Sequence, residues 1–283
     1  MKILSDVFRG RRKGLDVEKR FELLGKPIAG SASTYQHVRD KKTEQEYGLK
    51  ILDAVKTSQF RSKLKGLNVP TEAEITSKFN NTNIVKLHES GKTRSGEEFL
   101  LLEHCEGIRL DEAIKLARDK SVRPKTSLLV QMIRAVVEVH EFKFLHRDIC
   151  PRNFMLDLNS DRAKLFDFGL SLPNESEALL RSNRNGTAMY LAPEIVRRRR
   201  YDHRADIFSL GVTMFELASG KHPWEGTSSA LAFDTTDPLQ LQELCPLMDP
   251  KISQAIHRCI LAKPEDRFSS IKQVQFAIGR VLK

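Results

Sequence analysis

The sequence predicts an α+β fold in which a small, strand-rich amino-terminal part is followed by a larger, mainly helical part. Between Phe21 and Glu103, short apolar segments alternate with charged or glycine-containing turns, which is typical of antiparallel strands. After Glu106, apolar residues recur at helical spacing. A chain of 283 residues with 40% hydrophobic residues can bury a sizeable core. We expect a basic extension over residues 1–20, a first lobe over 21–105 and a second lobe over 106–283.

The first lobe is expected to be a small antiparallel sheet with one main helix. The helix is placed at Thr71–Phe79, because Pro70 and Thr71 precede two acidic residues, which suit a helix amino terminus. The strands are expected at Phe21–Leu24, Tyr47–Leu52, Ile84–Leu87 and Phe99–Leu102.

The second lobe is predicted to contain at least four helices, each with an apolar stripe or a continuous apolar core. Gly220 is expected to end one of them, since glycine commonly terminates helices. Their expected positions are Lys125–Phe142, Ala205–Ser219, Ile252–Leu261 and Ile271–Leu282.

Composition narrows the function classes. Lys and Arg exceed Asp and Glu by 47 − 37 = +10, which favours acidic partners such as nucleotides, phosphoproteins, nucleic acid or anionic lipid. The four cysteines show no disulfide-framework or zinc spacing, which is typical of a reducing compartment such as the cytoplasm. No apolar run is long enough for a membrane span, and no apolar stretch after the basic start indicates a secretory signal.

Four clusters of residues have side chains that could take part in catalysis or in metal binding. The segment His146–Asn153 holds an acid, an amide and two cations, and Lys164–Gly169 is an apolar strand that ends in Asp-Phe-Gly. Carboxylate and amide oxygens at loop ends are what hard divalent cations prefer. Lys50 is a lone cation within a strand, and Gly186–Glu194 ends in Ala-Pro-Glu. Each cluster alone has an ordinary structural explanation, such as a solvated lysine or a turn.

The order and spacing of the four clusters resemble the signature of the protein kinase family. The resemblance covers Phe21 to Lys283, so a single kinase domain of two lobes is expected over 21–283. It implies transfer of the γ-phosphate of ATP to Ser or Thr hydroxyls of protein substrates, with Mg²⁺ as the metal.

The resemblance assigns roles residue by residue. Asp148 would be the catalytic base, and Asn153 and Asp167 would hold Mg²⁺. Lys50 would contact the α- and β-phosphates, with Glu72 as its helix partner; Glu74 is the alternative partner.

The same resemblance implies a nucleotide site. Adenine would bond to backbone groups of Glu103 and Cys105, and the phosphate loop would carry Ile28, Gly30 and Ser33 at the family's three glycine positions. Only Gly30 matches, so we expect a stiffer loop that holds nucleotide less tightly.

Two neighbouring departures from the family concern the adenine face. Tyr35 replaces a valine and Gly48 replaces an alanine. We hypothesise that the space lost from residue 48 accommodates the ring of Tyr35.

The catalytic loop departs from the family at Cys150, where Ser/Thr kinases usually carry a lysine. Arg152 stands where tyrosine kinases supply an arginine, and we expect its guanidinium to replace the missing cation. Cys150 is expected to be a partly exposed thiol whose pKa is lowered by neighbouring cations.

The substrate class follows from the segment before Ala-Pro-Glu. Thr187 resembles the Ser/Thr-kinase form of this loop, and we weigh it above the tyrosine-kinase-like Arg152. The run Arg197–Arg200 is either a solvated turn or a patch that selects acidic substrates. Nucleic acid is not the expected partner, because only Tyr201 adds an aromatic residue beside these arginines.

Regulation by phosphorylation is also implied by the resemblance. Arg147 precedes Asp148 and could pair with a phosphate on Ser171, Ser176 or Ser182, of which Ser182 lies nearest the usual position.

Two structural pairings complete the expectations. Asp206 should anchor the backbone of the catalytic loop, and Glu194 should pair with Arg267.

Two alternatives remain open. A pseudokinase or weakly active nucleotide-binding scaffold is favoured by Ile28, Ser33, Cys150 and Thr76, and opposed by the presence of every metal-holding residue. A kinase of small molecules is disfavoured by Gly186–Glu194, which resembles a peptide-substrate segment.

Overall fold

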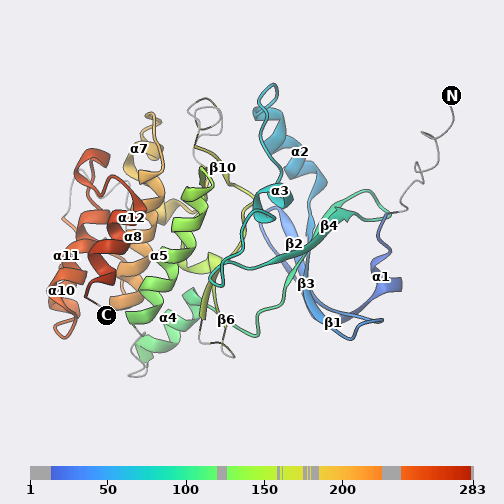
Figure 1. Cartoon of the computed structure of the whole chain (residues 1–283), viewed down its shortest axis with the longest axis horizontal. Coiled ribbons are helices and arrows are strands. Elements are labelled where there is room, and N and C mark those ends of the chain that lie inside the picture. The colour runs from blue at the N-terminus through green and yellow to red at the C-terminus, as the bar shows by residue number, and fades with distance from the viewer. Residues whose placement is uncertain are drawn as a thin grey trace, which may run out of the picture. The chain divides into compact units, whose positions relative to one another are not determined.

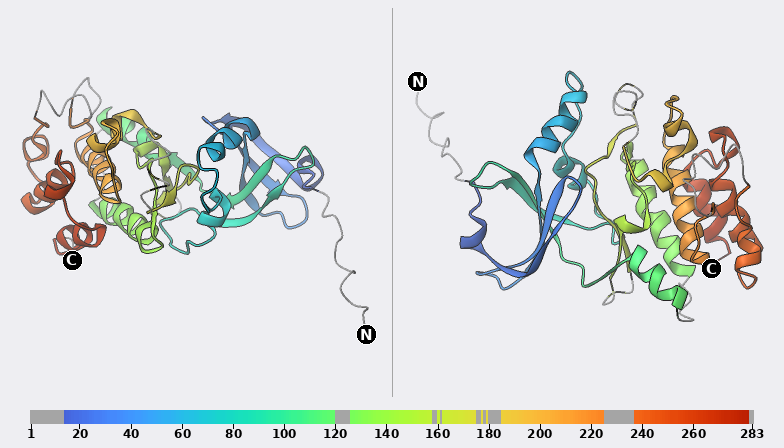
Figure 2. Two further views of the ribbon diagram at one scale, coloured as in Figure 1. Left: turned by 90° about the horizontal axis from the view of Figure 1, so that it is seen from above. Right: turned by 180° about the vertical axis from the view of Figure 1, so that it is seen from behind.

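The computed structural model describes residues 14–119, 126–157, 160, 162–174, 177, 179, 185–224 and 237–281. The chain divides into two compact units. The first comprises the residues up to Arg61 together with Leu87–His104, and the second comprises Ser62–Lys86 together with Cys105 and the residues that follow it. The first is built on an antiparallel sheet and the second is mainly helical (Figures 1 and 2), so the predicted α+β fold class is confirmed.

The first unit is a five-stranded antiparallel sheet with the strand order β1-β2-β3-β5-β4. A short hairpin turn joins β1 to β2, where Gly30 N donates to Ser33 O over 2.7 Å. The strands are β1 (Phe21–Ala29), β2 (Ser33–Asp40), β3 (Glu46–Leu52), β4 (Leu87–Lys92) and β5 (Glu98–Glu103).

One face of this sheet forms the core of the first unit. Its buried residues come from four of the five strands: Phe21, Val38, Leu49, Phe99 and Leu101. Residues of the opposite parity lie on the other face, because side chains alternate along a strand. That other face carries Tyr35, Lys50 and Gly48.

Residues 14–20, which the sequence assigned to an extension, lie on this unit. Leu15 bridges Thr93, and both Leu15 and Val17 pack against the core. The short helix α1 (Val17–Arg20) then leads into β1. Residues 1–13 are outside the described part of the chain.

The second unit surrounds a buried helix, α8 (Arg204–Ser219). Twelve of its residues are buried, and it ends at Gly220, whose φ of 71° requires the left-handed conformation that glycine adopts readily. Helices α5 (Thr126–Glu141) and α11 (Pro250–Cys259) contact α8, and α12 (Ile271–Gly279) contacts α5 and α11 (Figures 1 and 2).

Shorter elements complete the second unit. Its small helices are α3 (Glu72–Thr76), α4 (Leu110–Asp119), α7 (Pro193–Val196) and α10 (Leu241–Leu244). Its strands are β6 (Gly107–Arg109), β8 (Phe154–Asp157) and β9 (Arg162–Leu165), with the pair β7 (Phe144–Leu145) and β10 (Leu172–Pro173). None of the helices in the described residues is long and apolar enough to cross a membrane.

One expected strand is wrong in position. The apolar segment Ile84–Leu87 is not a strand of the five-stranded sheet; Ile84 and Val85 are buried, and Val85 N donates to Leu165 O in the second unit. The strand lies at Leu87–Lys92 instead, where most side chains are exposed. Burial against another element therefore explains the apolar pattern that suggested a strand.

Several elements were absent from the sequence predictions, among them β2 and α2 (Ala54–Lys63) of the first part of the chain. Strand β2 is polar, and helix α2 has no buried residue, so neither carries the apolar periodicity on which the predictions relied.

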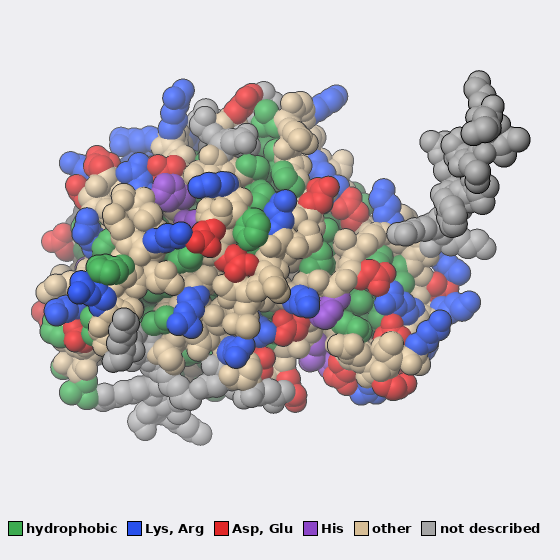
Figure 3. Space-filling model, in the orientation of Figure 1, with side chains coloured by type: hydrophobic (Ala, Val, Ile, Leu, Met, Phe, Trp, Pro, Cys, Tyr) green, Lys and Arg blue, Asp and Glu red, His purple; other side chains and the backbone are tan. Residues whose placement is uncertain are grey.

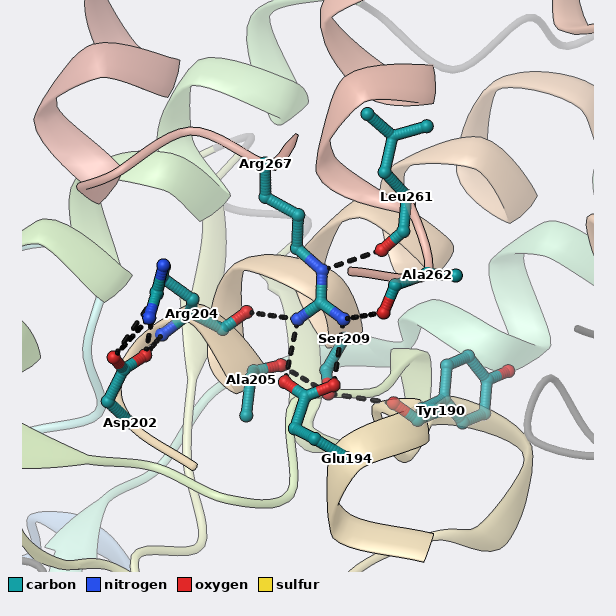
Figure 4. A network of polar contacts seen from close by, with 9 residues as sticks. All are labelled: Tyr190, Glu194, Asp202, Arg204, Ala205, Ser209, Leu261, Ala262 and Arg267. Atoms are coloured by element: carbon teal, nitrogen blue, oxygen red, sulfur yellow. Dashed lines mark hydrogen bonds and ion pairs between the residues drawn. The ribbon is translucent and has the colours of Figure 1, made fainter. Parts of the chain in front are cut away.

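A buried ion pair ties the segment after β10 to the carboxyl-terminal part of the second unit, as the sequence predicted. The guanidinium of Arg267 donates through Nη1 and Nη2 to the two carboxylate oxygens of Glu194, both over 2.8 Å (Figure 4). It also donates to the carbonyl oxygens of Arg204, Leu261 and Ala262. A fully buried guanidinium is stable only when its donors are used in this way.

We predict that Arg267→Ala lowers the free energy of unfolding of the second unit by about 3–5 kcal/mol, because it leaves the carboxylate of Glu194 buried without its cation. Urea unfolding would measure the loss. Lys272→Ala is the matched control: its 2.7 Å pair with Glu141 joins two exposed side chains and should cost less than about 1 kcal/mol. Equal losses in the two variants would contradict this assignment.

Candidate active site

The segment that follows β7 is held in shape by Asp206 on α8. Its Oδ2 accepts the backbone N–H of His146 over 2.8 Å, and its Oδ1 accepts that of Arg147 over 2.9 Å. His140 on α5 lies 2.9 Å from Oδ2 through Nε2. The predicted role of Asp206 is therefore confirmed, whereas His140 was not predicted to take part.

The charge of Asp206 is retained although the residue is buried. Burial alone would raise its pKa, but the hydrogen bond and charge of His140, with the neighbouring His146 and the N–H of Arg147, outweigh burial and leave the pKa lowered. A carboxylate with these partners constrains two consecutive peptide groups at once. One of them belongs to Arg147, whose φ of 69° is unusual for a residue with a side chain.

The loop so anchored presents Asp148 with its carboxylate oriented by three donors. Oδ1 accepts the backbone N–H of Thr187 over 2.7 Å and its hydroxyl over 2.8 Å. Oδ2 accepts Nδ2 of Asn153 over 2.9 Å, and the same nitrogen donates to the carbonyl oxygen of Asp148 over 2.7 Å. The side chain of Asn153 is thereby turned so that its amide oxygen, the atom that can bind a cation, faces away from Asp148.

Thr187 is the residue that sequence reasoning missed as part of the site. Besides its two bonds to Asp148, its hydroxyl accepts Nη2 of the exposed Arg152 over 3.0 Å and lies 3.6 Å from Sγ of Cys150. The sequence identified Thr187 only as a marker of substrate class. Thr187 and Asp148 are 39 residues apart in the sequence, so no local pattern predicts their contact.

The expectation for Cys150 is wrong. The thiol is buried, and burial, with the nearby charge of Asp148, raises its pKa to about 11. Arg152 acts in the opposite direction but is outweighed. Cys150 therefore fills space beside Thr187 and is not a reactive thiolate at neutral pH.

Asp167 follows β9 in the same unit, close to the loop of Asp148. The N–H of Phe166 donates to the carbonyl oxygen of Asn153 over 3.0 Å, which brings the residue before Asp167 beside Asn153. Asp167 has a φ of 66°, and its Oδ1 accepts the N–H of Gly169 over 3.4 Å.

Glu72 of α3 lies beside the same glycine. A methyl group built on Gly169 would lie 3.2 Å from Oε2 of Glu72 and 3.3 Å from Oδ1 of Asp167. The alternative acid, Glu74, is engaged in a capping box: its Oε2 accepts the N–H of Thr71 over 2.7 Å. Of the two acids, Glu72 is therefore the one placed near Asp167.

In the first unit, the structure places the ring of Tyr35 directly over Gly48. A methyl group on Gly48 would lie 2.5 Å from Cε2 of Tyr35 and 2.6 Å from its hydroxyl oxygen. Lys50, opposite Tyr35 in the β2–β3 register, is only 8% exposed. The hypothesis that the small residue 48 makes room for the large residue 35 agrees with this packing.

The candidate site residues of both units lie within a stretch of the chain that is similar to known proteins. A family model described as the protein kinase domain matches residues 20–276. The chain belongs to the protein kinase family. The expected resemblance is thus confirmed.

Three named kinases are similar to this chain. Serine/threonine-protein kinase DCLK3 of Mus musculus is 32% identical over 76% of this chain and 27% of its own length. Probable serine/threonine-protein kinase PknB of Corynebacterium glutamicum is 27% identical over 94% of this chain and 42% of its own length. The Aurora kinase of Yarrowia lipolytica is 31% identical over 94% of this chain and 69% of its own length. The chain thus spans less than half the length of the first two of these relatives.

The structure also places the remaining residues that were expected to bind the nucleotide. Ile28 is 61% exposed at the end of β1, and Gly30 begins the hairpin turn to β2. Glu103 ends β5 in the first unit, and Cys105 is a buried residue of the second. Their contacts with a nucleotide, and the pairing of Lys50 with Glu72, stay predictions.

The kinase's candidate phosphorylation sites differ in their placement. Ser171 is buried, and its hydroxyl donates to the carbonyl oxygen of His146, so it is not available for modification in this structure. Ser176 and Ser182 lie outside the described residues. Arg147 itself is buried and donates to Leu170 O and to the hydroxyl of Tyr201.

We predict that Gly48→Ala lowers the free energy of unfolding by about 1–3 kcal/mol and weakens ATP binding, because the new methyl group displaces the ring of Tyr35. The double variant Gly48→Ala/Tyr35→Val should recover most of both losses, since the ring is then absent. Chemical unfolding and calorimetric titration of the four proteins of this cycle measure the coupling. Additive effects of the two substitutions would refute the compensation.

We predict slow alkylation of Cys150. With a pKa of about 11, about one thiol in a thousand is ionised at pH 8, and burial limits access further. Iodoacetamide followed by peptide mass spectrometry should modify the half-buried Cys245 well before Cys150. Labelling of Cys150 at the rate of an exposed cysteine would show that its pKa is not raised.

Proposed function

We propose that this kinase domain transfers the γ-phosphate of ATP to Ser or Thr hydroxyls of protein substrates, with Asp148 as the catalytic base. The observation that supports this most is the orientation of the Asp148 carboxylate by Thr187 and Asn153. A carboxylate has about four lone-pair positions, and three donors use three of them. The remaining one is suited to accept the proton of a substrate hydroxyl.

Phosphoryl transfer requires charge neutralisation and alignment more than covalent help. Asn153 and Asp167 are the residues that would hold Mg²⁺: the first directs its amide oxygen away from Asp148, and the second places its carboxylate near that of Glu72. Two acids beside one glycine are a fitting environment for a cation. Bound magnesium would offset charge on the phosphate oxygens.

Lys50 and Arg152 supply the remaining positive charge in this proposal. Lys50 would contact the α- and β-phosphates, with Glu72 as its partner, and the backbone groups of Glu103 and Cys105 would bind adenine. Arg152 is exposed and already directed to the hydroxyl of Thr187 over 3.0 Å, which supports its role as the replacement for the lysine absent at Cys150.

Thr187 also supports Ser/Thr specificity. Its hydroxyl donates to Asp148 and accepts from Arg152, so it links the proposed base to the proposed phosphate-binding cation. Of the relatives above, DCLK3 is named a serine/threonine-protein kinase and PknB a probable one, which agrees with this substrate class.

An acidic peptide is the proposed preference among protein substrates. Arg197–Arg200 follow α7 directly and are all exposed. On the face drawn in Figure 3, Lys and Arg are interspersed with Asp and Glu. Nucleic acid is not the proposed partner, because Tyr201 alone adds an aromatic residue beside the arginines.

Regulation and compartment complete the proposal. Ser176 or Ser182 remain the proposed sites of activating phosphorylation, with Arg147 as the phosphate partner. The cysteines Cys105, Cys150, Cys245 and Cys259 are free thiols, which is consistent with the proposed cytoplasmic location.

The direct test is incorporation of labelled phosphate from ATP into a generic protein substrate in the presence of Mg²⁺. We predict activity in the wild type, phosphate on Ser and Thr in the hydrolysed product, and a loss of about 100-fold or more in Asp148→Asn. Glu243→Gln, a matched change at an exposed acid of α10, should retain activity. Nucleotide binding without any transfer would favour the pseudokinase alternative.

The acidic preference has its own test. Arg198→Ala/Arg199→Ala/Arg200→Ala should raise KM for an acidic peptide about tenfold, because each exposed charge contributes up to about 0.5 kcal/mol, and should leave kcat and the KM for ATP unchanged. The control Lys115→Ala/Lys251→Ala/Lys263→Ala removes the same charge from exposed positions elsewhere in the second unit. An equal rise in both triple variants would refute a specific role for the arginines.

A further inference from the structure

Three residues of the first unit to which the proposed function gives no role bring metal-binding atoms together. His37 lies on β2, Glu46 begins β3, and His104 follows the last residue of β5. One potential ligand atom from each lies within 4.8 Å of the others. We propose that His37, Glu46 and His104 form a binding site for a divalent transition-metal ion, with Zn²⁺ as the best match.

The strand register explains why these residues meet. His37 is opposite Gly48, and Arg39 is opposite Glu46, so His37 and Glu46 are diagonal neighbours on one face of the β2–β3 pair. Gly48 is in turn opposite Leu102, two residues before His104 on β5. Two of the candidate ligands thus lie on the paired strands β2 and β3, and the third directly follows β5, which pairs with β3.

Gly48 also leaves space above β3 for side chains of β2 to approach His104, which follows β5. The rings of His37 and His104 are stacked, with centroids 3.5 Å apart and planes within 9°. The hydroxyl of Tyr35 lies 3.2 Å from Nδ1 of His104. A larger residue at position 48 would meet the ring of Tyr35 first, as the 2.5 Å separation shows.

The distances are close to those of a metal site. Nε2 of His37 lies 2.8 Å from Oε2 of Glu46. Zinc bonds of about 2.0–2.1 Å place tetrahedral ligands about 3.3 Å apart. Binding therefore requires the two stacked imidazole rings to rotate until the ion lies in the plane of each ring. All three residues are half-buried, which leaves access for the ion and for water as a further ligand.

The charges suit a cation as well. Glu46 supplies the one carboxylate of the cluster. Arg39 donates to Oε1 over 2.7 Å, whereas His37 lies at Oε2, so the arginine fixes the carboxylate without occupying the oxygen nearest the histidine. Outer contacts of this kind, here from Arg39 and Tyr35, orient ligands in known metal sites.

The ligand set selects the metal. Two imidazoles and one carboxylate favour zinc and its neighbours among the transition metals, whereas magnesium prefers oxygen ligands alone. The site is therefore chemically distinct from the proposed magnesium ligands Asn153 and Asp167, and it would join β2, β3 and the end of β5.

Titration of the metal-stripped full chain with Zn²⁺, using a chromophoric chelator as competitor, tests the proposal. We expect the wild type to bind one equivalent more than His37→Ala/His104→Ala, and Glu46→Gln to weaken that equivalent by at least about tenfold. The control His88→Ala removes an exposed histidine of the same unit, which packs against Tyr47 and not in the cluster, and should retain it.

Cobalt supplies a second measurement that identifies the ligands. Co²⁺ should give a visible ligand-field band in the wild type and in His88→Ala that is lost in His37→Ala/His104→Ala, while the circular dichroism of the metal-free variants stays that of the wild type. Equal metal uptake and equal spectra in the wild type and the double variant would overturn the proposal. So would the loss of the equivalent in His88→Ala.

Discussion

The geometry of the candidate active site depends on one buried carboxylate. Asp206 accepts the consecutive backbone N–H groups of His146 and Arg147 and is itself held by His140. These bonds connect α8, the most buried helix of the second unit, to the loop that carries Asp148. Because most residues of α8 are buried, the core of the second unit fixes the position of Asp206, and Asp206 in turn fixes the position of the loop.

The rest of the site follows from that anchor. With the loop fixed, Asp148 meets Thr187, and Thr187 meets Arg152 and Cys150, so that the base, the adjacent cation and a buried thiol share one hydroxyl group. The raised pKa of Cys150 is a consequence of this packing. The segment that carries Thr187 leads to Glu194, whose bidentate pair with Arg267 ties it to the carboxyl-terminal part of the unit (Figure 4).

In the first unit, the packing of side chains on one face of the sheet depends on Gly48. Gly48 removes one side chain from the middle of a sheet face. Tyr35 covers the gap, and side chains of β2 contact His104, which follows β5. This packing agrees with the hypothesis that the departures from the family pattern at residues 35 and 48 compensate each other. The proposed zinc site occupies the same face of the sheet.

Sequence reasoning found what local pattern and family motifs encode. The helix that ends at Gly220, the anchoring role of Asp206 and the pair of Glu194 with Arg267 were all predicted, because each has a strong residue signal. Strand β2 and helix α2 were missed since their side chains are polar. The roles of Thr187 and Cys150 could not be predicted, because burial and contacts between residues far apart in the chain decide them.

The anchoring of the loop by Asp206 is tested most directly by amide hydrogen exchange in Asp206→Asn. An amide side chain replaces one of the two carboxylate oxygens by an NH2 donor, so it cannot accept both N–H groups in their present geometry, in which each is bound by a different oxygen. We predict that exchange at His146 and Arg147 rises at least about tenfold, while Met132 and Ile133 in α5 stay protected as in the wild type. Unchanged protection at His146 and Arg147 would contradict the account, because the loop would then be held by something other than this carboxylate.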